Sequence, residues 1–199
     1  MAEVPTIQAE RAFRREWKPG TPGDPGVIVR ERADLSLATL VALDRPPLER
    51  AILTRWRCAL PRGPKSAHTP ELSFLGVGPR TWLAVSATPD MPAELAASAG
   101  PHGAVADQSH GYVVIELSGA RVMSVLEKGV PIDLHQSVFA VSDAASTLCA
   151  QIGVIIWRLE RRPGFGMALF RSYARSFQDW LEDSAAEFGL RVDSGAGRD

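Results

Sequence analysis

The sequence has no long hydrophobic run and no large excess of charge of either sign. No uncharged apolar stretch reaches about 18 residues, so we expect no transmembrane helix. Residues 1–8 lack the basic start and long apolar core of a secretory signal. The net charge of −1 gives no reason to expect nucleic acid or an acidic membrane as a partner. We therefore expect a cytoplasmic protein with neither nucleic-acid nor membrane partners.

Residues that hold metals or form disulfides are scarce. The two cysteines, Cys58 and Cys149, lie far apart and form no C-x-x-C motif, which favours two reduced and buried thiols. The histidines form no H-x-x-x-H or H-E-x-x-H pair, and no cysteine has metal-ligand spacing to any of them. These histidines are His68, His102, His110 and His135. The spacing therefore predicts no metal site.

The motifs of nucleotide binding and serine hydrolysis are also missing. The G-x-G of residues 164–166 lacks the third glycine of a dinucleotide fingerprint and is better explained as a hairpin turn. The chain has neither a G-x-x-x-x-G-K-[ST] phosphate loop nor a G-x-S-x-G elbow. Asp107, Ser109 and His110 are the residue types of a hydrolase triad, but adjacent residues of an extended segment point to opposite faces. The sequence therefore predicts no nucleotide, flavin or hydrolase site.

The 199 residues, 45% of them hydrophobic, are enough for one core or two closely packed halves. We expect residues 1–45 to form an N-terminal arm or linker, because residues 19–26 contain three prolines and three glycines. Simple disorder explains that segment equally well. The remaining residues, 46–199, form the predicted folded domain, with halves of about 46–104 and 105–199.

The hydrophobic spacing predicts strands followed by a helix in each half, and hence an α+β fold with antiparallel sheets covered on one face by helices. The first half has predicted strands at residues 50–56, 72–77 and 82–86 and a helix at 91–99. The second half has predicted strands at 112–117, 146–152, 154–159 and 166–170, and helices at 120–128 and 172–188. A short strand at 27–29 is a further prediction.

Within the second half, Val113, Ile115 and Leu117 alternate on one strand face, and Ser118 is a candidate helix cap. The last predicted helix carries an apolar stripe, with Ser172 as its cap and Gly189 as its end. The stripe consists of Tyr173, Phe177, Trp180, Leu181, Ser184 and Phe188. This pattern predicts a core helix, with a subunit interface as a secondary use.

Arginines cluster in the C-terminal part of the chain, with Glu160 as the acid among them. They are Arg158, Arg161, Arg162, Arg171 and Arg175. We expect a local basic patch that meets an acidic partner subunit. A solvated strand end is an equally good interpretation.

Four segments in order resemble one family. Residues 107–128 contain a D-x-S-H-G motif that is followed by a predicted strand, an S-G-A turn and a short helix. Residues 75–85 contain a predicted strand, a Gly-Pro turn and a second strand that begins with Trp-Leu. The G-x-P-x-D-L-H motif occupies residues 129–135. A closing strand at 155–159 and an R-S-x-A-x-S and W-L helix at 171–181 complete the set. Together they resemble the folate-binding fold of aminomethyltransferases (T-proteins), and most fully the gamma subunits of heterotetrameric sarcosine oxidase.

The resemblance implies a bacterial complex with alpha, beta and delta subunits, in which this chain packs mainly on alpha. The complex would oxidatively demethylate sarcosine to glycine with oxygen, giving hydrogen peroxide and formaldehyde or 5,10-methylenetetrahydrofolate. FAD, FMN, NAD and tetrahydrofolate would then lie in the other subunits. The catalytic relatives have an N-D-V segment where this chain has Gly129, and glycine carries no carboxylate. We therefore assign no catalytic, cofactor-binding or metal-binding residue to this chain.

Two other functions remain open from the sequence. One is a stand-alone folate-dependent, aminomethyltransferase-like enzyme that uses Asp133 in place of the missing acid. The other is a regulatory module that binds a small ligand. Both differ from a structural subunit in requiring a ligand to bind the isolated chain.

Overall fold

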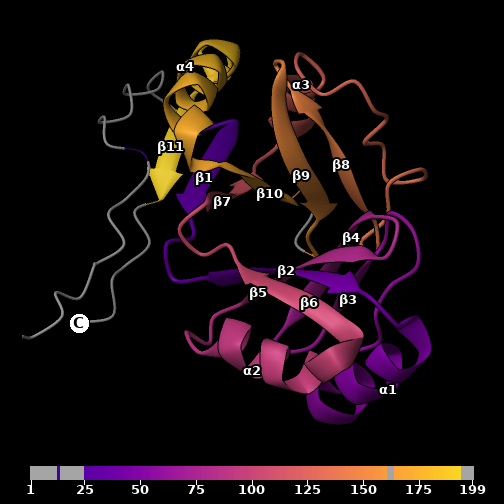
Figure 1. Cartoon of the computed structure of the whole chain (residues 1–199). Coiled ribbons are helices and arrows are strands. Elements are labelled where there is room, and N and C mark those ends of the chain that lie inside the picture. The colour runs from indigo at the N-terminus through magenta and orange to yellow at the C-terminus, as the bar shows by residue number, and fades with distance from the viewer. Residues whose placement is uncertain (1–12, 14–24, 161–163, 194–199) are drawn as a thin grey trace, which may run out of the picture.

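The computed structural model describes Phe13 and residues 25–160 and 164–193. Two β-sheets pack against each other, and two helices cover the outer face of each (Figure 1). All strand pairs are antiparallel except one at the edge of the larger sheet. The predicted α+β architecture with antiparallel sheets is confirmed.

The larger sheet, called sheet A, has six strands. In spatial order they are β11 (Leu190–Asp193), β1 (Val27–Glu31), β7 (Tyr112–Ser118), β10 (Gly164–Phe170), β9 (Ile152–Arg158) and β8 (Ala144–Cys149). The five strands of sheet B are β3 (Ser66–His68), β4 (Ser73–Gly78), β5 (Thr81–Ser86), β2 (Ser36–Ala42) and β6 (Gly103–Asp107). The parallel pair is β1 with β11.

Sheet B is covered by α1 (Arg45–Trp56) and α2 (Met91–Ala99), and sheet A by α3 (Val122–Leu126) and α4 (Ala174–Ala185). Two 3₁₀ turns, η1 (Gly100–His102) and η2 (Arg171–Tyr173), follow α2 and precede α4. In the described part of the chain, no helix is both long and apolar enough to span a membrane.

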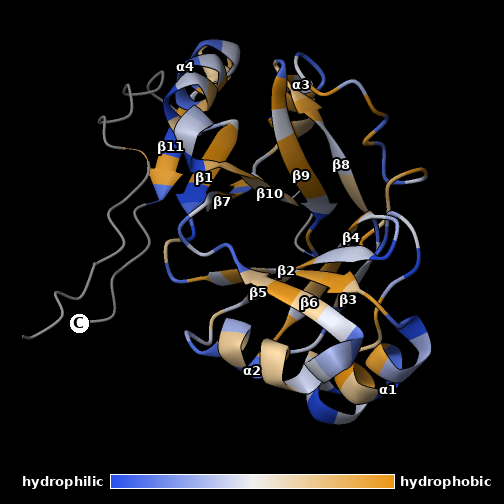
Figure 2. Ribbon diagram, in the orientation of Figure 1, coloured by the Kyte–Doolittle hydropathy of each residue, from blue (hydrophilic) through white to orange (hydrophobic). Residues whose placement is uncertain are grey.

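Alternation along the strands divides the buried side chains into three cores. On β7, Val113 and Ile115 face α3 and α4, whereas Val114 faces sheet B. On β5, Trp82 faces α1 and α2, whereas Leu83 faces sheet A. In Figure 2 the strands are mostly hydrophobic, while α1 and α4 mix hydrophobic and hydrophilic residues, as expected of helices with one buried face. The predicted alternation of β7 is confirmed.

The prediction of an arm or linker over residues 1–45 is wrong for residues 27–42. Residues 27–31 form β1, which lies between β11 and β7, and residues 36–42 form β2, which lies between β5 and β6. Both strands bury alternating apolar side chains, including Val27 and Leu40. Residues 1–12 and 14–24 lie outside the described residues, and Phe13 is buried in the core of sheet A. Sheet B also extends through β6 to residue 107, three residues past the predicted end of the first half.

The strand predicted at residues 50–56 is a helix. α1 begins with prolines in its first turn, where their missing N–H groups cost no helical hydrogen bond. Its buried residues Leu48, Ile52 and Trp56 recur every four positions, which is helical and not strand spacing. Arg57 ends the helix in the left-handed conformation, with φ of 54°.

The two helices on sheet A are shorter than predicted, and neither has a side-chain cap. Ser118 is the last residue of β7, and Ser172 lies in η2, so the helices begin at Val122 and Ala174 after tight turns. The stripe of α4 is confirmed as a core face at Phe177 and Leu181, which are fully buried, whereas Tyr173 is exposed.

Candidate functional site

A cavity of about 390 Å³ opens where the two sheets meet. Its walls come from the β1–β2 link, the β6–β7 link and the start of η2. These links are the places where the chain passes from one sheet to the other, so the site depends on how the sheets are connected. This cavity and its rim form the candidate functional site.

An arginine held by two carboxylates lies on one wall of the cavity. Nε and Nη2 of Arg32 donate to the two oxygens of Asp34 at 2.8 and 3.0 Å, and Nη1 donates to Oε1 of Glu116 at 2.5 Å. The hydrogen bond to Asp34, followed by Glu116, raises the pKa of Arg32, and the same hydrogen bond lowers the pKa of Asp34. Arg32 and Asp34 therefore keep their opposite charges at neutral pH.

The D-x-S-H segment, with Asp107, Ser109 and His110, also lines the cavity. The Ser109 hydroxyl lies 2.6 Å from Oδ1 of Asp107, and the Ser109 N–H donates to the same oxygen at 2.9 Å. The hydrogen bonds from Ser109 lower the pKa of Asp107. The Leu37 N–H donates to the Ser109 hydroxyl at 3.1 Å, which fastens the segment to β2. His110 accepts a bond from Nε of Arg171 through its backbone carbonyl. The Ser109 hydroxyl thus hydrogen-bonds both the Asp107 carboxylate and the Leu37 backbone, and these bonds stabilise the turn between β6 and β7.

Aromatic side chains lie beside the cavity at the end of β10, where Phe170 contacts the lining residue Tyr112. The Tyr112 and Phe170 rings stack with centroids 4.6 Å apart, and Tyr173 follows in η2. Phe170 and Tyr173 are among the exposed large hydrophobic residues. Sequence reasoning missed this aromatic cluster and the Arg32 cluster, because both form only when distant strands pair. The R-x-D spacing of Arg32 and Asp34 was the one local pattern that could have indicated the ion pair between them.

The glycine that replaces the family's carboxylate has a specific neighbour. A β-carbon on Gly129 would come 2.5 Å from Cζ2 of Trp180 and 2.9 Å from Cε2. Trp180 lies on α4, so its indole fills the space that a longer side chain at position 129 would need. An acidic group does not fit there unless Trp180 moves.

Asp133, the residue that could replace that acid, lies elsewhere and is exposed. Its Oδ1 accepts the His135 N–H at 2.8 Å, and Nδ1 of His135 lies 2.7 Å from the Ser137 hydroxyl. These bonds define a surface turn. The cavity at the junction of the sheets is lined by other residues.

The remaining histidines and the cysteines have structural contacts. Both ring nitrogens of His68 hydrogen-bond serine hydroxyls, at 2.8 and 2.9 Å, and burial lowers its pKa. Cys58 and Cys149 are confirmed as buried and unpaired, and burial raises the pKa of each thiol. Within residues 25–160 and 164–193, no three His, Cys, Asp or Glu side chains gather as metal ligands.

The predicted arginine patch is wrong for Arg158. Its side chain is buried, Nε donates to the Phe139 carbonyl at 2.5 Å, and Nη2 donates to the Leu134 carbonyl. Its guanidinium carbon lies 4.7 Å from the centroid of the Phe165 ring. Arg158 therefore fixes an internal loop, and Arg161 and Arg162 lie outside the described residues.

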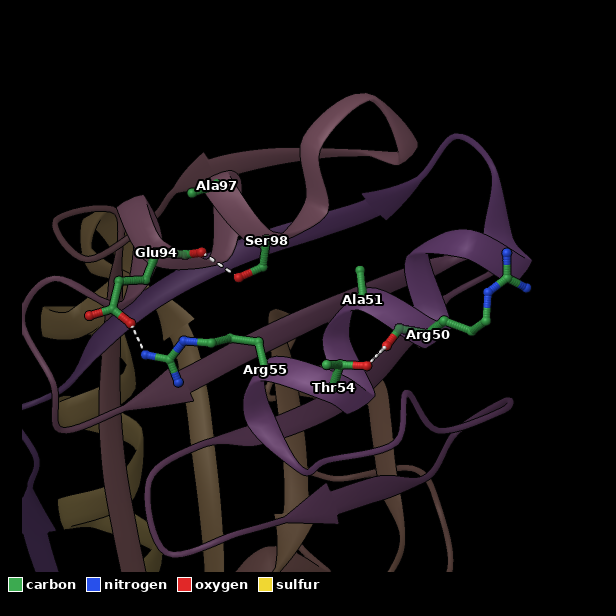
Figure 3. A pocket seen from close by; sticks show the side chains of 7 residues that line it. All are labelled: Arg50, Ala51, Thr54, Arg55, Glu94, Ala97 and Ser98. Atoms are coloured by element: carbon green, nitrogen blue, oxygen red, sulfur yellow. Dashed lines mark hydrogen bonds and ion pairs between the residues drawn. The ribbon is translucent and has the colours of Figure 1, made fainter.

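A second hollow, of about 580 Å³, lies between α1 and α2 on the outer surface (Figure 3). Arg55 and Glu94 form an ion pair between the two helices. The hydroxyls of Thr54 and Ser98 donate to backbone carbonyls of their own helices, at 2.8 and 2.7 Å. The polar groups of this hollow are thus engaged in one ion pair and in hydrogen bonds to the backbone.

The fold is that of the aminomethyltransferases. The glycine cleavage system aminomethyltransferase T from Bartonella henselae superposes with a TM-score of 0.61 over 84% of this chain and 48% of that chain, at 16% identity. A chain of the heterotetrameric sarcosine oxidase from Corynebacterium sp. U-96, solved in complex with pyrrole 2-carboxylate, matches with a TM-score of 0.77 and 26% identity over 91% of both chains.

The sequence comparison agrees with this second match. Residues 70–187 match the model described as "Sarcosine oxidase, gamma subunit family", which is more than half of the chain. The chain belongs to this family. A sarcosine oxidase subunit gamma from Corynebacterium sp. (strain P-1) is 35% identical over 118 residues, which span 58% of this chain and 58% of that relative.

Proposed function

We propose that this chain is a non-catalytic gamma subunit of a heterotetrameric sarcosine oxidase. The observation that carries the proposal is the match over 91% of both chains to a chain of such an enzyme. The complex would oxidatively demethylate sarcosine to glycine with oxygen, and release hydrogen peroxide with formaldehyde or 5,10-methylenetetrahydrofolate. Its partners would be the alpha, beta and delta subunits, with alpha as the main contact.

The packing of Trp180 on Gly129 supports the non-catalytic role. If Gly129 is equivalent to the carboxylate of the catalytic relatives, this chain has replaced an acid by an aromatic contact between α4 and the end of α3. FAD, FMN, NAD and tetrahydrofolate would supply the redox and one-carbon chemistry from the other subunits. Two observations support this placement: Arg32 and Asp34 are hydrogen-bonded to each other, and the Ser109 hydroxyl accepts the Leu37 N–H. We place the complex in the cytoplasm, in keeping with two unpaired cysteines.

Native mass spectrometry of the tagged chain, purified from its own host, tests the proposal. We expect it to co-purify with three other chains, with the flavin absorbance following the larger ones. The purified chain alone should neither turn over sarcosine nor retain flavin. A chain that is purified alone and binds tetrahydrofolate, with binding lost in Asp133→Ala, would instead support the stand-alone enzyme. A chain that self-associates and is stabilised by a small ligand would support the regulatory module.

A further inference from the structure

The end of β10 and the η2 turn that follows it present two large aromatic side chains to solvent. Phe170 is 47% exposed and Tyr173 is 49% exposed. The other exposed large hydrophobic residues of the described ranges are aliphatic and lie on separate elements. Phe170 stacks on Tyr112, which lines the cavity, and Tyr173 follows three residues later in η2. These three residues are called the aromatic rim. Clustered exposed aromatics are typical of protein association surfaces, where tyrosine contributes much of the binding energy.

The backbone beneath the aromatic rim is held firmly. The Arg171 N–H donates to the Gly111 carbonyl at 2.9 Å, and Nε of Arg171 donates to the His110 carbonyl at 3.0 Å. The start of β7 is thereby fastened to the start of η2, in addition to the ladder that pairs Phe170 with Tyr112. The rings are therefore presented from ordered strands, which lowers the conformational entropy lost on docking.

The adjoining cavity has more acidic than basic groups. Its charged lining residues are Glu31, Asp34 and Asp107 against Arg32 and Arg171. Arg32 also pairs with Glu116, so one guanidinium is shared by two carboxylates. Asp107 accepts its hydrogen bonds from Ser109, which is neutral. The cavity therefore favours a cation, and the faces of the neighbouring aromatic rings attract cations as well.

We propose that the aromatic rim and this cavity together form the surface on which another subunit of the sarcosine oxidase complex docks. The partner presents an apolar segment to Phe170 and Tyr173, and a lysine or arginine side chain that enters the cavity toward Asp107. The negative charge of the cavity selects a basic partner segment. For the arginine patch, in contrast, the sequence predicted an acidic partner. This docking assignment rests on the proposed function and names the surface through which that function is exercised.

The first test co-expresses all four subunits with a tag on this chain and measures how much of the complex is recovered. The variant Phe170→Glu/Tyr173→Glu is expected to lower the recovery at least about ten-fold, because a few aromatic residues typically carry most of the binding energy of an interface. The control is Leu53→Glu, which places a single negative charge on a 50% exposed side chain of α1. Both variants alter exposed positions, and thermal unfolding verifies that each chain is folded.

The second test concerns the charge. Asp107→Asn keeps an oxygen that accepts from Ser109 but removes the negative charge, and is expected to weaken assembly several-fold. The control is Glu127→Gln, which neutralises an exposed acid just after α3. Recovery of the wild-type complex should fall as salt rises, and this fall should be smaller for Asp107→Asn.

The possible results test the proposed docking surface and the proposed function independently of each other. If the wild-type chain assembles and the rim variant assembles equally well, the docking surface is wrong even though the subunit role stands. If Leu53→Glu is the variant that prevents assembly, the partner docks on α1 instead. If the wild-type chain brings down no other subunit, the proposed function fails first. If it forms homodimers that Phe170→Glu/Tyr173→Glu disrupts, the occupant is a second copy and the proposal is overturned.

Discussion

The indole of Trp180 lies against the α-carbon of Gly129, so closely that a β-carbon there would come 2.5 Å from Cζ2. The contact joins α4 to the segment after α3, the two helices that cover sheet A. The Gly129 carbonyl also accepts the Ala150 N–H at 3.0 Å, so the backbone is held from a second side. Gly129 is therefore required by packing rather than by backbone conformation.

Gly129→Ala is expected to lower the free energy of unfolding by about 1–3 kcal/mol, because an added methyl overpacks a filled contact. Urea denaturation measures the effect. The matched control is Gly153→Ala, since a β-carbon on Gly153 would meet nothing within 4 Å. In a Trp180→Ala background the cost of Gly129→Ala should largely disappear. An equal cost in both backgrounds would contradict the packing argument.

Arg158 holds the loop between α3 and β8 from inside the protein. Its guanidinium donates to the Leu134 and Phe139 carbonyls, and Arg158→Met would leave these acceptors without that donor. We expect a loss of about 2–4 kcal/mol in the free energy of unfolding. Arg158→Lys should not restore it, because one ammonium cannot reproduce the planar fork. Arg175→Met, at an exposed position on α4, is the control and should stay within about 0.5 kcal/mol.

Much of the fold could be predicted from local patterns. The alternation of Val113, Ile115 and Leu117, and the helix at Met91–Ala99, both appear in the structure as predicted. α1 was mistaken for a strand because a short apolar run contains too few residues to distinguish the two periods. β2 was missed because residues 1–45 were assigned as a whole to an arm, on the basis of the proline- and glycine-rich residues 19–26.

The candidate site could be predicted much less well. Phe170 and Tyr112 are 58 positions apart in sequence and stack only because β7 pairs with β10. The partners of Arg32 follow in the same way from the pairing of β1 with β7. Arg158 was placed in a surface patch by its charge, whereas two backbone carbonyls compensate that charge inside the protein. Tertiary pairing of this kind leaves no periodic trace in the sequence.

Both cysteines should be unreactive in the folded protein. Burial raises the pKa of the Cys149 thiol to about 12 and also raises that of Cys58. Only the thiolate reacts with Ellman's reagent, so at pH 8 we expect Cys149 to react on the order of a thousand times more slowly than an ordinary thiol. In guanidinium chloride both thiols should react at once. Rapid labelling of either cysteine under native conditions would show that the surrounding core opens.

An ion pair between the two sheets should make stability depend on pH. Lys65 precedes β3 of sheet B and donates to Oδ1 of Asp143, which precedes β8 of sheet A. Oδ2 of Asp143 accepts the Ala140 N–H at 2.8 Å. Burial alone would raise the pKa of Asp143, but the hydrogen bonds from Lys65 and Ala140 together outweigh it and lower the pKa below its usual value.

Because the pKa of Asp143 is lower in the folded chain, the unfolded chain binds the proton more readily. The stabilisation by Asp143 is therefore complete above the unfolded pKa of about 3.9 and is lost as the pH falls through the folded pKa. Asp143→Asn should lower the free energy of unfolding by about 1–3 kcal/mol at pH 7, and the difference from wild type should narrow below about pH 4. Urea denaturation across this pH range measures both. Glu127→Gln, at an exposed acid without an ion pair among the described residues, is the control. A difference for Asp143→Asn that stayed constant down to the lowest pH would show that the amide loses shape or hydrogen bonding rather than charge.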